Sequence, residues 1–280
     1  MSALPVGGPG PRLDRLDEPK TIDDVLRTLD QIIEWCKEAQ SGIGYFAVLY
    51  RRITLAIREA IISNVFDNGR VIGDLDVAFA TRYFNALNAY FYPDEFDGPT
   101  LPWQVAFVGD QDRQALILQH MLAGLNAHIT YDLGLALLKV AGQSMRDLKP
   151  DYDRVNVILC DQVPDILKVV DKLSPEIRWT RYLIPGEISL LKRSVTRLRR
   201  GAWLFAFYMA THPENAEPRS LHQEAWTSAL SSWYLQPSGW IKLLPWVVRF
   251  IGEHESRDVA YNLTQLDVVS KTPQKSDKIR

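Results

Sequence analysis

The feature that most constrains the fold of this chain is a long, almost uncharged stretch at residues 114–138, QALILQHMLAGLNAHITYDLGLALL. Asp132 is its single charged residue, and its most notable other polar residues are His120, Asn126 and His128. A helix that is apolar around most of its circumference belongs at the centre of a fold. A carboxylate placed there must be paired, bound to a metal or protonated. We therefore predict a buried central helix at about residues 113–140 that carries a small polar site.

Helical periodicity also dominates the rest of the chain. The apolar spacing and the capping residues predict helices at about residues 21–41, 45–63, 74–92, 150–164 and 187–210. The prolines of residues 93–110 indicate a loop, with Trp103 anchoring it against the core. No strand-like alternation and no internal repeat is sustained. The sequence thus predicts an all-α protein, a single-domain helical bundle built around the central helix.

The two ends of the chain differ from its middle in composition and in the structure they predict. Residues 1–20 are rich in Pro, Gly and charge and predict a disordered leader, whereas 268–280 predict a flexible tail. Residues 21–267 form the expected all-α domain. In its last quarter Trp226, Trp233, Trp240 and Trp246 follow one another at spacings of six or seven. Because Pro237, Gly239 and Pro245 interrupt them, we expect these side chains to pack short helices against the body rather than to form a repeat.

Composition narrows the classes of function. A formal charge of -2 and a pI near 6.2 favour neither nucleic acid nor an anionic membrane as partner. The two cysteines have no zinc-ligand spacing, and the N-terminus lacks a signal-peptide pattern. Polar residues within 114–138 would be costly in lipid, which argues against a membrane span. We expect a cytoplasmic protein, and the composition is compatible with a homo-oligomer.

His128 and Asp132 are the centre of the predicted site. On a helical wheel starting at Leu116 they fall at about 120° and 160°, inside the apolar sector. An i, i+4 pair of this kind allows the carboxylate to orient the imidazole, or both groups to bind one metal ion. His120 lies about 12 Å away along the axis, so a shared metal would require another helix. Gly124 permits close approach of a partner helix or a ligand.

Two arginines are expected to face this site from other helices. Arg82 falls near the centre of the apolar face of residues 74–92, with Asp76 and Tyr83 at its edge. Arg52 falls beside the apolar stripe of residues 45–63. Because arginine keeps its charge, each needs an anionic partner, and Asp132 or Asp76 is the obvious protein candidate.

Any single member of this set could be a satisfied core residue, but together they exceed what a helical core needs. A second polar group is a basic run that we interpret as a solvated helix face, because it lacks interleaved aromatics. It consists of Lys192, Arg193, Arg197, Arg199 and Arg200. The sequence contains no nucleophile elbow, phosphate-binding loop or HExxH motif.

Several segments resemble a family of uncharacterised, stand-alone helical proteins classed as a domain of unknown function. They are YRRIT at 50–54, LDVAFATRY at 75–83, WQVAF at 103–107, LQHMLAGLNAHITYDLG at 118–134 and DYDRVN at 151–156. The resemblance implies an all-helical domain and assigns no reaction. A fainter likeness is to helical zinc-dependent phospholipases C and nucleases, which carry an H-x-x-G-D motif. Here His120 is followed by Gly124 and then by Leu125 in place of the acidic ligand.

These observations lead to three hypotheses. The first is an enzyme acting on a largely apolar small molecule, with His128 as acid or base oriented by Asp132, and with Arg82 or Arg52 binding an anionic group. In it, His120, Asn126, Tyr83, Asp76 and Trp103 position the substrate. No cofactor is required. The second is a metal-dependent hydrolase with a divalent ion on His120, His128 and Asp132. The third is a helical ligand-binding or scaffolding protein without catalysis.

Overall fold

The computed structural model describes residues 12–111, 115–177, 187–237 and 244–275, and all regular secondary structure within them is helical. The predicted all-α class is therefore confirmed. The α-helices are α1 (Ile22–Ala39), α2 (Ile43–Ile62), α3 (Gly69–Phe91), α4 (Leu101–Gln111), α5 (Ile117–Asn126), α6 (Leu133–Ala141), α7 (Met145–Leu173), α9 (Glu187–Thr211), α10 (Ala216–Leu235), α11 (Leu244–His254) and α12 (Val259–Ser270). Short 3-10 turns are η2 (Gly142–Ser144) and η3 (Pro213–Asn215), and a π-helical segment, η1 (Ala127–Asp132), joins α5 to α6.

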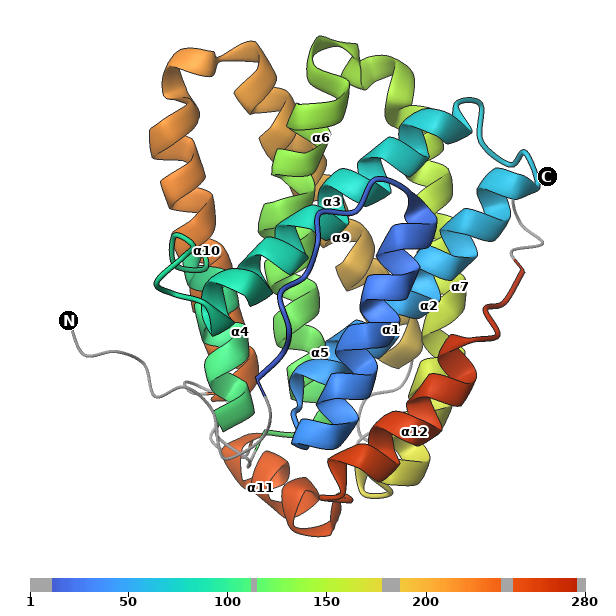
Figure 1. Cartoon of the computed structure of the whole chain (residues 1–280), viewed down its shortest axis with the longest axis vertical. Coiled ribbons are helices and arrows are strands. Elements are labelled where there is room, and N and C mark those ends of the chain that lie inside the picture. The colour runs from blue at the N-terminus through green and yellow to red at the C-terminus, as the bar shows by residue number, and fades with distance from the viewer. Residues whose placement is uncertain (1–11, 112–114, 178–186, 238–243, 276–280) are drawn as a thin grey trace.

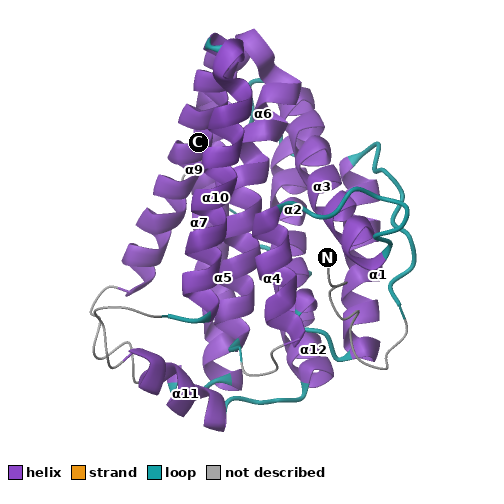
Figure 2. Ribbon diagram, turned by 90° about the vertical axis from the view of Figure 1, so that its left-hand side faces the viewer, coloured by secondary structure: helices purple, strands orange, loops and turns teal. Residues whose placement is uncertain are grey.

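The helices surround the column formed by α5, η1 and α6 (Figures 1 and 2). Helices α2 and α10 pack on α5, whereas α3 and α9 pack on α6. Helix α7 lies against α2 and α9, and α12 closes the bundle against α1, α2 and α7. Buried side chains from Leu13 to Leu266 belong to one continuous hydrophobic core. The polar residues of the column therefore lie inside the protein.

The central stretch differs from expectation in one respect, since it is not a single regular α-helix. Residues 127–132 are π-helical, and the Leu133 amide donates to the His128 carbonyl five residues earlier. A π turn adds a residue to the helical repeat and is often found at functional sites. By length and composition Ile117–Ala141 could cross a membrane, and 83% of its apolar window is buried inside the fold.

Two predicted boundaries were wrong on the N-terminal side of this column. Helix α3 begins at Gly69, capped by the Asn68 side chain, rather than near Asp74. Residues 101–111, expected to be loop, form α4. Its proline, Pro102, occupies the first turn, where the missing N–H costs no helical hydrogen bond. The predicted loop therefore ends at Thr100, whose carbonyl accepts from Trp103 and Gln104.

The prolines of α7 do not limit that helix. It runs from Met145 to Leu173 with both Pro150 and Pro164 inside it, whereas we expected a helix bounded by them. Its buried face continues through Leu159, Val163 and Leu167. Burial of that face outweighs the loss of one backbone hydrogen bond at Pro164. The sequence also predicts a shorter helical piece that holds Ile177, Trp179 and Tyr182, and most of it lies outside the described residues.

Both predicted terminal segments contribute contacts to the bundle. In the described part of the leader, Leu13 and Leu16 are buried, and the Leu16 backbone exchanges two hydrogen bonds with Asn88. At the other end α12 continues to Ser270, so the expected tail boundary at 268 falls inside a helix. Gln274 also exchanges two hydrogen bonds with Gln162 of α7.

The tryptophans of the C-terminal quarter do not pack as predicted. Trp226, Trp233 and Trp246 are all exposed, at 59%, 40% and 64% of their surface, and Trp240 lies outside the described residues. Helix α10 instead buries a face of small polar residues, Thr227, Ser228 and Ser231. Hydrogen bonds from α5 reach this face, which leaves Trp226 and Trp233 on the solvent side of α10.

Candidate functional site

Asp132 at the end of η1 is the centre of a buried hydrogen-bonded cluster. Its Oδ1 accepts from Arg82 Nε of α3 at 2.8 Å, and its Oδ2 accepts from Trp103 Nε1 of α4 at 2.7 Å. His128 Nδ1 lies 3.3 Å from the same Oδ2. Three elements thus converge on one carboxylate. The structure brings together His128, Asp132, Arg82 and Trp103, which the sequence had singled out.

These contacts fix the charges of the cluster. Burial alone would raise the pKa of Asp132, but the Arg82 charge and the hydrogen bonds from His128 and Trp103 lower it below 3.8. For His128, burial outweighs the attraction of Asp132 and holds the pKa below 6.5. At neutral pH Asp132 is therefore ionised and His128 is neutral. Since the carboxylate can only accept, the imidazole carries its proton on Nδ1 and a lone pair on Nε2.

Aromatic side chains enclose the imidazole of His128. Phe79 stacks on it, with ring centroids 3.4 Å apart, and the Tyr50 and Phe46 rings meet it edge-on at 4.6 and 5.5 Å. Phe46 packs directly on the backbone of Gly124, where an added Cβ would lie 2.6 Å from its ring. The expected close approach at Gly124 is thus made by α2. His128 Nε2 is buried and has no hydrogen-bond partner within the described ranges.

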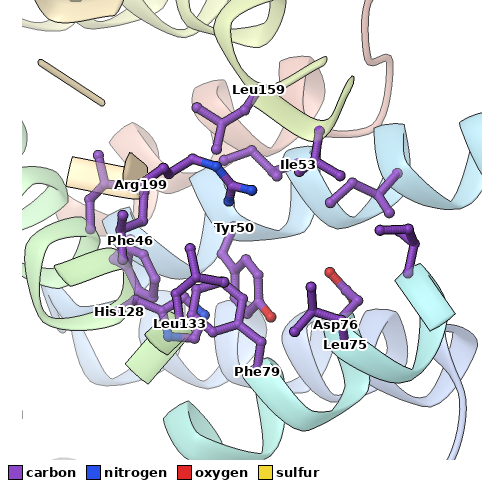
Figure 3. A pocket seen from close by; sticks show the side chains of 15 residues that line it. Phe46, Tyr50, Ile53, Leu75, Asp76, Phe79, His128, Leu133, Leu159 and Arg199 are labelled. Carbon is purple, nitrogen blue, oxygen red and sulfur yellow. The ribbon is translucent and has the colours of Figure 1, made fainter. Parts of the chain in front are cut away.

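A cavity of about 40 Å³ adjoins this imidazole and is lined almost entirely by apolar side chains. Its walls come from α2, α3, α5, η1, α6, α7 and α9, with Ile53, Leu75 and Leu159 among the contributors (Figure 3). One water needs roughly 10–15 Å³ measured in this way, so the space suits a few small groups. Its polar lining residues are Tyr50, Asp76, His128 and Arg199.

Asp76 is the one carboxylic acid among the described lining residues of the cavity. It is buried in α3, and loss of hydration raises its pKa from 3.8 to about 7. Its Oδ2 and the Tyr50 hydroxyl have no hydrogen-bond partner among the residues described. In Figure 3 both groups point into the space between the apolar side chains. One cavity therefore holds a neutral imidazole and a carboxyl group that is half protonated near pH 7.

The other predicted site residues have different surroundings. Asn126 donates to the Thr227 carbonyl and the Ser231 hydroxyl and accepts from Thr130, so it joins η1 to α10. Tyr83 is buried beside Trp103, with ring centroids 4.9 Å apart.

His120 and Arg52 do not lie at the cavity. His120 lines a separate groove between α5, α10 and α11. Arg52 pairs with Asp165 at 2.9 Å and with the carbonyls of Val269 and Thr272, so the predicted partners Asp132 and Asp76 were wrong for it.

The alternative metal site has no ligand cluster in the described parts of the chain. There, no three His, Cys, Asp or Glu side chains gather closely enough to hold one ion. His128 and Asp132 are adjacent, but His120 faces a different groove. The predicted set of His120, His128 and Asp132 is therefore not assembled.

Arg199 is a cavity residue that the sequence interpretation does not identify as a candidate for the site. We assigned it to a solvated basic face, yet its side chain is buried and lines the cavity. The signal was present in the spacing of α9, where Val195, Arg199, Ala202 and Ala206 follow at intervals of four, three and four. All four are buried on one face. Tyr50, four residues after Phe46, could have been found in the same way.

Comparison with known proteins places this helical fold in a family without assigning it a reaction. Neither the search of curated proteins nor that of solved structures gave a significant match. The family match covers residues 22–237, which include every cavity residue named above. On that match, the chain belongs to DUF5995, a family of unknown function.

Proposed function

We propose that the protein is an enzyme that transfers protons on a largely apolar small molecule bound in the His128 cavity. The observation that carries this proposal is the presence of His128 and Asp76 on one cavity, with their pKa values moved in opposite directions by their surroundings. A neutral imidazole and a protonated carboxyl at the same pH form a base and an acid.

The roles follow from the contacts of each group. His128 Nε2 is the only nitrogen of that ring left to accept a substrate proton, because Nδ1 faces Asp132. Asp132 orients the imidazole and stabilises its protonated form, and Arg82 and Trp103 hold Asp132 in place. Asp76 can return a proton to another substrate atom. The net change is an isomerisation, after which a proton passing from His128 to Asp76 restores both groups.

A non-catalytic ligand-binding role is the second candidate, and the small volume of the cavity favours it. At about 40 Å³, the space accommodates only part of a drug-sized molecule unless the apolar side chains move. In that role the same groups would hydrogen-bond a ligand without turnover. The two candidates differ in whether His128 accelerates a reaction.

Elimination of 5-nitrobenzisoxazole tests the proposal, because this planar apolar probe reacts by loss of one proton to a base. We expect the protein to exceed the rate of the same concentration of free imidazole. His128→Ala should lower the rate by about 100-fold or more. As the pH is lowered from 6.5, the rate of the wild-type protein should stay constant until the pH reaches the lowered pKa of His128. Below that pKa the imidazole is protonated and the rate should fall.

His254→Ala is the matched control, because His254 is an exposed histidine on α11. It should leave the rate unchanged, and circular dichroism should show that both variants are folded. A wild-type rate no higher than that of imidazole, or a rate that survives His128→Ala, would contradict the catalytic proposal. Binding of the probe without turnover would favour the second candidate.

A further inference from the structure

Arg199 is a buried cation on the cavity wall. Its side chain comes from α9 and is 3% exposed. Nε donates to Asn156 Oδ1, and the guanidinium carbon lies 4.3 Å from the centre of the Tyr152 ring. The Tyr152 hydroxyl in turn donates to the Arg199 carbonyl at 2.7 Å. These contacts fix the guanidinium in one position.

The contacts leave most of the guanidinium without an acceptor. Hydrogen bonds from its two terminal nitrogens to described residues are absent, and so is any described carboxylate at ion-pair distance. Figure 3 shows these nitrogens pointing into the cavity, which Ile53 and Tyr50 also line. Arginine cannot release its proton, and a buried charge without a counterion is costly. The position is therefore suited to an anion supplied from outside the chain.

A second apolar cavity lies next to the first. It has a volume of about 40 Å³ and shares Ile53, Leu125 and Leu159 with the first. Its remaining lining residues are all aliphatic or Met, contributed by α2, α5, α7 and α9. An unbranched hydrocarbon chain could extend from one cavity into the other between those three shared side chains. Two small neighbouring spaces suit such a chain better than a bulky ring system.

We propose that the ligand is an amphipathic monoanion, a carboxylate on an unbranched hydrocarbon chain, with the carboxylate on Arg199 and the chain in the two apolar cavities. This inference rests on the proposed function in taking the His128 cavity as the ligand site. The planar guanidinium presents two parallel N–H donors that match the two oxygens of a carboxylate.

The charge of the site favours a carboxylate over a phosphate monoester. Arg199 is the only Lys or Arg among the described lining residues of either cavity. One positive charge neutralises a monoanion, whereas a phosphate dianion would bring an uncompensated charge into an apolar space. Ionised Asp76 on the same cavity would oppose a second negative charge.

Titration calorimetry with octanoate and 1-octanol tests this inference, because the two probes share a chain length and differ in their charge. We expect octanoate to bind more tightly than 1-octanol by roughly ten- to a hundredfold, the range for a hydrogen-bonded charge. Arg199→Met should abolish that preference and leave 1-octanol binding unchanged. Arg200→Met, which alters the exposed neighbour on α9, should preserve it.

The outcomes separate this inference from the proposed function. Equal affinity for the two probes, no binding of octanoate, or an unchanged preference in Arg199→Met would overturn the carboxylate assignment. None of these results changes the expected reaction of 5-nitrobenzisoxazole, which needs His128 but no anion. The comparison of two probes on the unmodified protein also keeps the test valid if Arg199→Met fails to fold.

Discussion

Arg52 and Arg199 are both buried arginines, but the chain surrounds them differently. Arg52 is fully buried and donates to the Asp165 carboxylate and to the carbonyls of Val269 and Thr272. Arg199 has one amide acceptor, Asn156, and faces an apolar cavity. The first arginine joins α2 to α7 and to the C-terminal segment. The second has unused donors at the place where a ligand would bind.

The same contrast occurs between two neighbours on the central column. Asn126 satisfies its amide through Thr130 and α10, whereas His128, two residues later, keeps Nε2 unpaired within the described structure. Buried polar groups normally find partners, so the exceptions carry more functional information than burial itself. Buried polar groups that are paired within the fold should contribute to its stability. Buried polar groups without a partner should contribute little to stability or reduce it.

The largest loss should follow Asp132→Ala. This substitution leaves the Trp103 and His128 N–H groups buried without an acceptor and removes the partner of Arg82. Removing one partner of a buried charge cluster costs several kcal/mol, and with three donors affected we expect about 5 kcal/mol. Urea denaturation measures it.

Asp153→Ala is the matched control for that loss. Asp153 pairs with Lys149, and both side chains are about half exposed. Its loss should stay within about 0.5 kcal/mol. A similarly small effect of Asp132→Ala would show that the fold does not depend on the buried cluster.

The sequence predicted the helical class and the central pairing because both depend on short-range periodicity. His128, Asp132 and Arg82 could be placed by counting residues along helices. The partner of Arg52 could not, because Asp165 and the carbonyls of residues 269 and 272 reach it only through the tertiary packing of α7 and α12.

The cavity itself also could not be predicted from the sequence. Its described walls come from seven elements, and only their packing decides which side chains leave a space. The π turn at residues 127–132 was equally hidden, since the apolar pattern of the stretch fits a regular helix. Arg199, by contrast, was predictable, because it occupies an apolar face that we interpreted as solvated.

Asp76→Asn should have the next largest effect, and with the opposite sign. The folded pKa of Asp76 is raised to about 7 by burial, so the native carboxyl keeps its proton while the unfolded one ionises above 3.8. Wild-type stability should therefore fall as the pH rises from about 4 to 7 and then level off. A pKa raised from 3.8 to about 7 corresponds to roughly 4 kcal/mol.

Asparagine cannot ionise, so the variant should lack this fall. It should match the wild type near pH 4 and be more stable than the wild type at pH 8, by at most roughly 4 kcal/mol. Chemical denaturation at several pH values measures the difference. If stability depended on pH in the same way for the two proteins, Asp76 would be hydrated or paired in solution. It would then be a polar group with a hydrogen-bond partner, like Asn126.

Arg52→Met and Arg199→Met give the most direct test of the difference between the two buried arginines. Methionine retains much of the apolar packing of the arginine stem and removes the charge. Arg52→Met should cost about 3 kcal/mol, because Asp165 Oδ2 and the carbonyls of Val269 and Thr272 each lose a hydrogen bond from the guanidinium. Arg199→Met should change stability by no more than about 1 kcal/mol, since the lost contacts to Asn156 and Tyr152 are offset by relief of an uncompensated buried charge.

Equal losses in denaturant midpoint, measured without ligand, would show that both arginines are structural. If Arg199 is retained to bind an anion, Arg199→Met should lower the stability less than Arg52→Met does. The reason is that Arg52 is neutralised by a carboxylate of the protein, whereas Arg199 is not paired with one in the described part of the chain.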